Sequence, residues 1–157
     1  MSTKMDYSIE RKDAFRLCVY TKNFTAEGGE KRIPAFWEEY YQNKVCKEIP
    51  GYLGLCVQEK ENAEEFLYGI GCDADDVEGT PEGFRIVHIP AFTWAVFKCV
   101  GPTPDSIQKA WDEINCKWLP EASYELIPDY IIENYLPGNS SSSDYVSEIW
   151  IPVKEKP

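Results

Sequence analysis

Apolar residues fall into strand-length runs separated by two segments in which they recur at three- and four-residue spacing, as on one side of a helix. The first run, Phe15 to Phe24, predicts a strand that ends before the glycine pair in segment 27–30. A helix is predicted from Ile33, and two strands are predicted over 52–58 and 65–72. The helix places large side chains on one side: Ile33, Trp37 and Tyr41, flanked by Phe36 and Tyr40.

The second half of the chain repeats this order of elements. A strand is predicted over 85–100, with an interruption near Pro90, and a helix follows over 106–119. Two further strands, 130–136 and 145–153, close the chain. The helix has an apolar stripe made of Ile107, Ala110, Trp111, Ile114 and Trp118.

This repeated order predicts an α+β fold. We expect one domain, residues 1–157, built from two strand-helix-strand-strand modules at about 6–76 and 84–155. Their sheets could pack side by side and leave a cleft between the helices and strands of the two halves, where small-molecule sites tend to form. Identity between the two halves is too low to demonstrate a duplication.

Composition indicates ligand contact by aromatic residues, the cellular location of this domain and the redox state of its cysteines. Aromatic residues reach 14%, more than a small core needs, so we expect some rings to contact a ligand. No apolar run approaches the roughly 20 residues of a membrane span, and the first residues do not form a signal peptide. We therefore expect a cytoplasmic protein. Its six cysteines, which form no C-x-x-C pair, are predicted to be reduced core thiols.

Charge and motif spacing exclude several functions. A net charge of −11 disfavours direct binding of nucleic acid. The Gly69–Ala74 segment fits a dinucleotide fingerprint, but acidic residues, Gly and Pro follow it where a helix is required. The acidic loop that comes next has Glu78 where a calcium loop needs Gly. His88 is the only histidine, so we predict no metal site, no cofactor and no Ser-His or Cys-His catalytic residues.

Glu133 is the residue that the sequence favours for binding a ligand. Alternation along Tyr130–Leu136 places Ile131, Glu133 and Tyr135 on one face of a strand. A buried carboxylate without a partner takes up a proton unless a cation compensates its desolvation, and an organic cation can also stack on aromatic rings. The alternative is that Glu133 lies on the solvent face of an edge strand. Glu148, which shares a face with Trp150, is expected to be exposed.

Several segments in this order resemble the effector-binding domain of AraC-type and MerR-type regulators, also called the gyrase-inhibitor-like domain. The resemblance covers nearly the whole chain and rests on IPAFWEEYY, HIPAFTWAVFKCVGP, SIQKAWDEINCKWLP, YIIENYLP and YVSEIWIPV. It implies that the two modules form a pseudo-twofold repeat, with antiparallel sheets around a central ligand pocket. That pocket would contain Glu133 and Tyr145, with an aromatic residue from the first helix, Phe36 or Trp37. It assigns Tyr68 and Trp94 less firmly. The regulators' DNA-binding region is missing here, so a stand-alone domain is expected.

Three functions follow as hypotheses. The leading one is a sensor or sequestering domain that binds cationic, amphipathic or aromatic small molecules through Glu133, Tyr135 and the aromatic residues above, without catalysis. The second is a hydrolase of electrophilic toxins that uses Glu133 as a general base and a nearby tyrosine as proton donor. The third is an acidic module that docks a protein partner such as gyrase.

Overall fold

The computed structural model describes residues 6–157 except 26–28, 43–51, 59–64, 78, 81–82, 104, 128 and 137, and at residues 25, 29–34, 41, 58 and 65 it describes the backbone alone. The predictions that concern Cys46, Glu78 and the side chains of Ile33 and Tyr41 lie outside this description. The chain forms two compact units, which are described separately. Unit 1 comprises Met1–Lys12 and Phe92–Pro157, and unit 2 comprises Asp13–Ala91.

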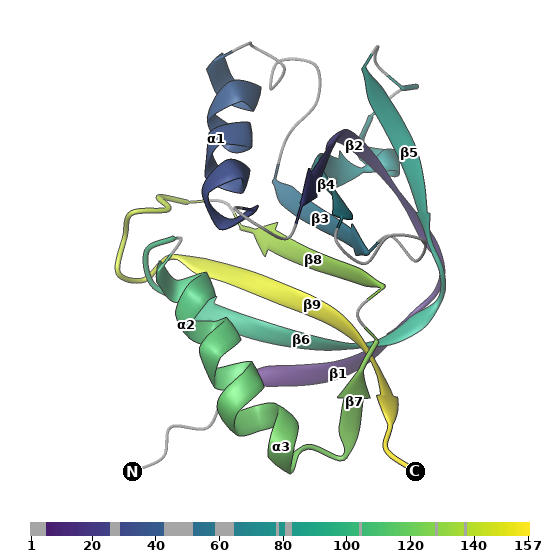
Figure 1. Cartoon of the computed structure of the whole chain (residues 1–157), viewed down its shortest axis with the longest axis vertical. Helices are drawn as coiled ribbons and strands as arrows, with labels where there is room; N and C mark the ends of the chain where they lie inside the picture. Colours follow the sequence, from purple (N-terminus) through teal and green to yellow (C-terminus); the bar gives the residue numbers. More distant parts are fainter. Residues whose placement is uncertain are drawn as a thin grey trace. The chain divides into compact units, whose positions relative to one another are not determined.

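Unit 2 is an antiparallel sheet with one helix (Figure 1). The strands stand in the order β3-β4-β2-β5. Aromatic side chains of α1 and of the sheet form its core, in which Phe24, Phe36, Tyr40, Tyr68 and Ile70 are buried. The element bounds are Phe15–Thr25 for β2, Gly29–Gln42 for α1, Leu53–Gln58 for β3, Glu65–Asp73 for β4 and Phe84–Ile89 for β5, with a short 3-10 turn at Ala74–Asp76.

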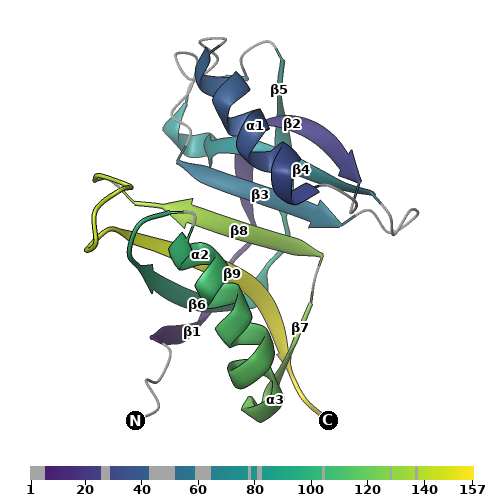
Figure 2. The same cartoon turned by 60° about the vertical axis from the view of Figure 1, so that its left-hand side comes forward.

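Unit 1 is also an antiparallel sheet, with strand order β1-β6-β9-β8 and with β7 paired to β9. Its helix α2 lies along one face of the sheet, as Figure 2 shows. Under α2, Phe97, Cys99, Ile149 and Ile151 are buried. The bounds are Tyr7–Lys12 for β1, Phe92–Val100 for β6, Asp105–Glu113 for α2, Ile114–Trp118 for a π-helix, Leu119–Glu121 for α3, Tyr124–Leu126 for β7, Tyr130–Tyr135 for β8 and Val146–Glu155 for β9.

The predicted α+β class with antiparallel sheets is confirmed. Both units contain the strand-helix-strand-strand order, as β2-α1-β3-β4 in unit 2 and β6-α2-β8-β9 in unit 1. The predicted module bounds, about 6–76 and 84–155, differ from the two units, because β1 pairs with β6 of unit 1 and β5 pairs with β2 of unit 2. The pseudo-twofold arrangement around a central pocket stays a prediction.

Candidate functional site

Glu133 projects from β8 toward the helix-covered face of the unit 1 sheet. In the register between β8 and β9 it stands opposite Ile149, which in turn stands opposite Phe97 on β6. Directly paired residues of antiparallel strands share a face, and Ile149 and Phe97 both belong to the buried core cluster that includes Ile107 and Ala110 of α2. The carboxylate is therefore placed beside an apolar layer, and the partial exposure of Glu133 is a property of the residue as a whole.

Two neutral groups hold the Glu133 carboxylate. The hydroxyl of Tyr135 donates a hydrogen bond of 2.7 Å to Oε2, and the side chain of Trp111 on α2 also donates to the carboxylate. Burial raises the pKa of Glu133 above its usual range, and these two hydrogen bonds lower it by less than burial raises it. Among the residues that the structure describes, no Lys, Arg or His contributes to this balance. The described residues of this site thus supply donors for the anion and no cation.

Trp111 belongs to this site, although the sequence analysis assigned it to the apolar stripe of the helix. It lies on the last turns of α2, directly before the π-helix Ile114–Trp118. Single π-helical turns inside α-helices occur often at functional sites, because they change the direction of side chains next to them. A tryptophan in the apolar stripe of a helix carries no sequence signal that separates a ligand-site donor from a core residue.

Two further polar side chains lie on the same face of the sheet. Cys99 of β6 stands opposite Ser147 of β9, and Ser147 stands opposite Tyr135 of β8. Ser147 is fully buried, and Cys99 is almost so. Burial, followed by the negative charge of Glu133, raises the pKa of the Cys99 thiol to about 12. Both groups are consequently neutral at physiological pH, and the Glu133 carboxylate is the ionisable group of this cluster.

Glu148 on β9 projects to the other face of the same sheet. Its Oε1 accepts hydrogen bonds from the side-chain amide of Asn134, at 3.0 Å, and from the indole of Trp150, at 3.2 Å. The expectation that Glu148 is exposed was wrong, because these two neighbours cover it in part. The Nζ of Lys12 lies 4.4 Å from the Trp150 ring centroid, so a cation already contacts the indole that donates to this second carboxylate.

The remaining predicted site residues of unit 1 lie in different places. Tyr145 comes directly before β9, and its hydroxyl donates a hydrogen bond of 2.8 Å to the carbonyl of Leu136, which follows β8. By the period of two it shares the face of Ser147 and Glu133. Trp94 is fully buried on the opposite face, where its ring packs against Trp150. The structure therefore separates Trp94 from Glu133 by the thickness of the sheet.

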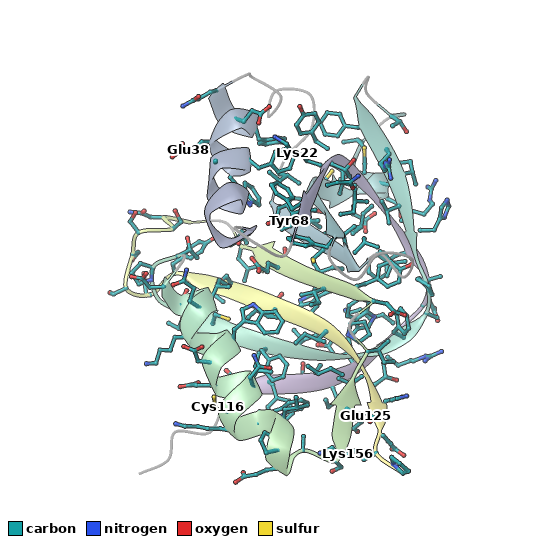
Figure 3. The ribbon with its side chains drawn as sticks, in the orientation of Figure 1. Lys22, Glu38, Tyr68, Cys116, Glu125 and Lys156 are labelled. Atoms are coloured by element: carbon teal, nitrogen blue, oxygen red, sulfur yellow. The ribbon has the colours of Figure 1, made fainter. Side chains whose placement is uncertain are left out.

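The other predicted aromatic residues form a cluster in unit 2. The indole of Trp37 on α1 donates a hydrogen bond of 2.9 Å to the hydroxyl of Tyr68 on β4. Figure 3 labels Tyr68. The ring of Phe36 meets that of Tyr68 edge-on, with centroids 6.3 Å apart. Phe36 and Tyr68 are buried, whereas Trp37 is partly exposed. In this cluster Trp37 is the ring with surface to offer a ligand.

Other chemistry finds little support in the described part of the chain. The residues described contain no group of three or more His, Cys, Asp or Glu side chains placed to hold a metal ion. His88 lies exposed on β5. None of the described helices combines the length and the apolar character that crossing a membrane requires.

A desolvated carboxylate among aromatic and aliphatic side chains matches the lining of small-molecule sites, which is mostly apolar with a few placed polar groups. The chain belongs to the family of integron-associated effector binding proteins, whose model matches residues 8–153. This match confirms the resemblance to effector-binding domains.

Individual relatives agree with the family. A DNA gyrase inhibitor from Erwinia billingiae is 30% identical over 99 residues, so the match spans 63% of this chain and 63% of that protein. A Staphylococcus aureus protein solved as a proposed transcription regulator superposes with a TM-score of 0.80 at 22% identity, over 96% of this chain and 99% of its own. SAV2435, solved with tetraphenylphosphonium bound, gives 0.79 at 22% identity over 96% and 94%. The two structures establish the shared fold.

Proposed function

We propose that this protein binds cationic, amphipathic or aromatic small molecules by pairing them with the carboxylate of Glu133, as a sensor or sequestering domain. The effector-binding family and a structural neighbour that holds tetraphenylphosphonium support small-molecule binding. The observation that carries the rest is the environment of Glu133, which has two neutral donors, a desolvated carboxylate and no cation among the described residues.

A cation is the ligand that this environment favours. Desolvation costs the ionised carboxylate free energy, and a ligand's positive charge recovers part of that cost by Coulomb attraction at low local dielectric. Tyr135 and Trp111 leave lone pairs of the carboxylate unoccupied, because each donates one hydrogen bond. Their rings are partly exposed and present aromatic surface to a cation, and one such contact contributes about 0.5–2 kcal/mol.

The test is a titration of tryptophan fluorescence with ligands that share a shape and differ in charge. Tetraphenylphosphonium and tetraphenylborate are near isosteres of opposite sign, and triphenylphosphine oxide is a neutral relative. We expect saturable quenching by the cation and weaker binding of the other two. Glu133→Gln should weaken cation binding by about 1–3 kcal/mol, or roughly 5- to 150-fold.

Glu148→Gln is the matched control, because Glu148 is a mid-strand carboxylate of the same sheet on the other face. It should leave the affinity for tetraphenylphosphonium within twofold of wild type. Equal losses for Glu133→Gln and Glu148→Gln, or equal losses for the cation and the neutral ligand in Glu133→Gln, would contradict charge pairing at Glu133.

A second function has one observation in its favour. The Tyr135 hydroxyl lies 2.7 Å from a carboxylate whose pKa is raised, which is the arrangement that a general base with a neighbouring proton donor requires. In that case Glu133 would activate a water molecule against a strained electrophile and Tyr135 would protonate the leaving group. Mass spectrometry of the ligand after prolonged incubation distinguishes the two, since a binding protein returns the ligand intact and a hydrolase adds the elements of water.

A further inference from the structure

Cys18 and Cys72 stand directly opposite each other on neighbouring antiparallel strands, β2 and β4 of unit 2. Both are free thiols that are fully buried. They form one small cluster with Ala74, and Tyr52 and Phe84 pack against it. The other cysteines that the structure describes lack this arrangement, because Cys56 stands opposite Tyr68, Cys99 opposite Ser147, and Cys116 is exposed on the π-helix.

The register places these two thiols within reach of a disulfide. Directly opposed residues of an antiparallel pair have Cα atoms about 4.5–5.5 Å apart, and disulfides span about 4.4–6.8 Å between Cα atoms. The carbonyl of Gly71 accepts a hydrogen bond from the backbone of Tyr52, so Gly71 directs its polar groups toward β3 and Cys72 directs its own toward β2. Cys18 and Cys72 are thus a hydrogen-bonded pair, in which the Cβ atoms must move closer together.

We propose that Cys18 and Cys72 form a reversible disulfide when hydrogen peroxide oxidises the protein, and that this bond staples β2 to β4. The first thiol, as its thiolate, attacks a peroxide oxygen, the O–O bond breaks, and a sulfenic acid and water result. The second thiolate then attacks that sulfur, the S–S bond forms, the S–O bond breaks and a second water leaves. Two thiols lose two protons and two electrons, and the peroxide is reduced to two waters.

The surroundings make this pair slow to oxidise and easy to reduce. Burial raises the pKa of the Cys72 thiol to about 11, so little thiolate is present and the strands must open locally before peroxide reacts. Tyr52 covers the pair, and its hydroxyl donates to Asp76 at 2.6 Å and accepts from the backbone of Asp73 at 3.1 Å. A disulfide that forces the Cβ atoms together is strained, and strained disulfides are more readily reduced than structural ones.

The test is peptide mapping under non-reducing conditions after the folded protein has been treated with hydrogen peroxide. We expect an intramolecular crosslink between the peptides that contain Cys18 and Cys72, and a monomer lighter by two hydrogens. Oxidation should raise the melting temperature by roughly 4–16 °C, because the bond closes a long loop in the unfolded chain. Dithiothreitol should reverse both changes. Tyr52→Phe should accelerate crosslinking, since it loosens the cover over the thiols.

Cys18→Ala should abolish the crosslink and the rise in melting temperature, whereas the matched control Cys56→Ala, on neighbouring β3, should keep both. Two outcomes would overturn the proposal. In one, Cys18 and Cys72 remain thiols, in wild type and in Tyr52→Phe, after peroxide has fully oxidised the exposed Cys116. In the other, the intramolecular crosslink persists in Cys18→Ala. Neither readout involves ligand binding, so the result is independent of the function proposed for Glu133.

Discussion

Replacing Glu133 by Gln is expected to stabilise the unliganded protein at neutral pH. The variant keeps the size of the side chain and an oxygen that accepts from Tyr135 or Trp111, and it removes a charge that burial destabilises. A buried group left without its partner costs about 1–3 kcal/mol, and more if it is charged. Because two hydrogen bonds offset part of that cost here, we expect a gain of about 1–2 kcal/mol, or a melting temperature roughly 2–8 °C higher.

The assay is urea and thermal unfolding of wild type and Glu133→Gln across a range of pH. The pKa of Glu133 in the folded state lies above its unfolded value of about 4.5. The folded state therefore binds more protons between these two pKa values, and the stability that the protonated group contributes is lost as pH rises through the folded pKa. The advantage of the variant should be small near pH 4.5 and reach its maximum above the folded pKa.

Glu148→Gln serves again as the control, because Glu148 accepts two hydrogen bonds on the other face and its amide replacement retains acceptor capacity for Asn134 or Trp150. We expect it to be neutral or slightly destabilising. A Glu133→Gln variant that is less stable than wild type at about pH 8, or whose advantage is the same at every pH, would refute the reasoning about desolvation.

Three further changes have defined outcomes. Tyr135→Phe removes a hydrogen bond that lowers the pKa of Glu133, so the affinity for tetraphenylphosphonium, followed by fluorescence, should fall about 3- to 10-fold and its pH profile should shift upward. Gly71→Ala places a Cβ 1.9 Å from the backbone oxygen of Cys18, and urea unfolding should show a loss of roughly 1–3 kcal/mol or more. The pKa of Tyr52 is raised from 10.0 to about 12, so wild type should lose stability between these pH values. Thermal unfolding of Tyr52→Phe should lack that alkaline loss.

The sequence predicted the elements whose apolar pattern is strong and missed those whose pattern is weak. The strand β1 was not predicted, because its residues are mostly exposed and charged side chains interrupt the alternation of apolar and polar positions. Its backbone pairing with β6 defines it as a strand. The short β7 was also missed. The interruption predicted near Pro90 within 85–100 separates β5 from β6. The sequence did not indicate that these two strands belong to different units, because that depends on their different pairing partners.

The site residues on strands were predictable where the alternation of side chains assigns them to one face of the sheet. They were not predictable where the packing of one element on another determines the direction of a side chain. Alternation alone placed Glu133 and Tyr135 on one face, and the hydrogen bond between them agrees. Trp94 was assigned to the pocket, but β6 is apolar on both faces, so its sequence does not indicate which face meets the helix. Trp111 was missed because the direction of a helical side chain depends on how α2 packs on the sheet.

The most direct test of the account is the number of protons released when tetraphenylphosphonium binds, measured by calorimetric titration of wild type and Glu133→Gln in buffers of different ionisation enthalpy. If the cation pairs with a carboxylate whose pKa is raised, wild type should release protons below the folded pKa of Glu133 and none well above it. Glu133→Gln should release none at any pH. Binding to wild type without proton release across this range, or with the same release in Glu133→Gln, would contradict the pairing of the cation with Glu133.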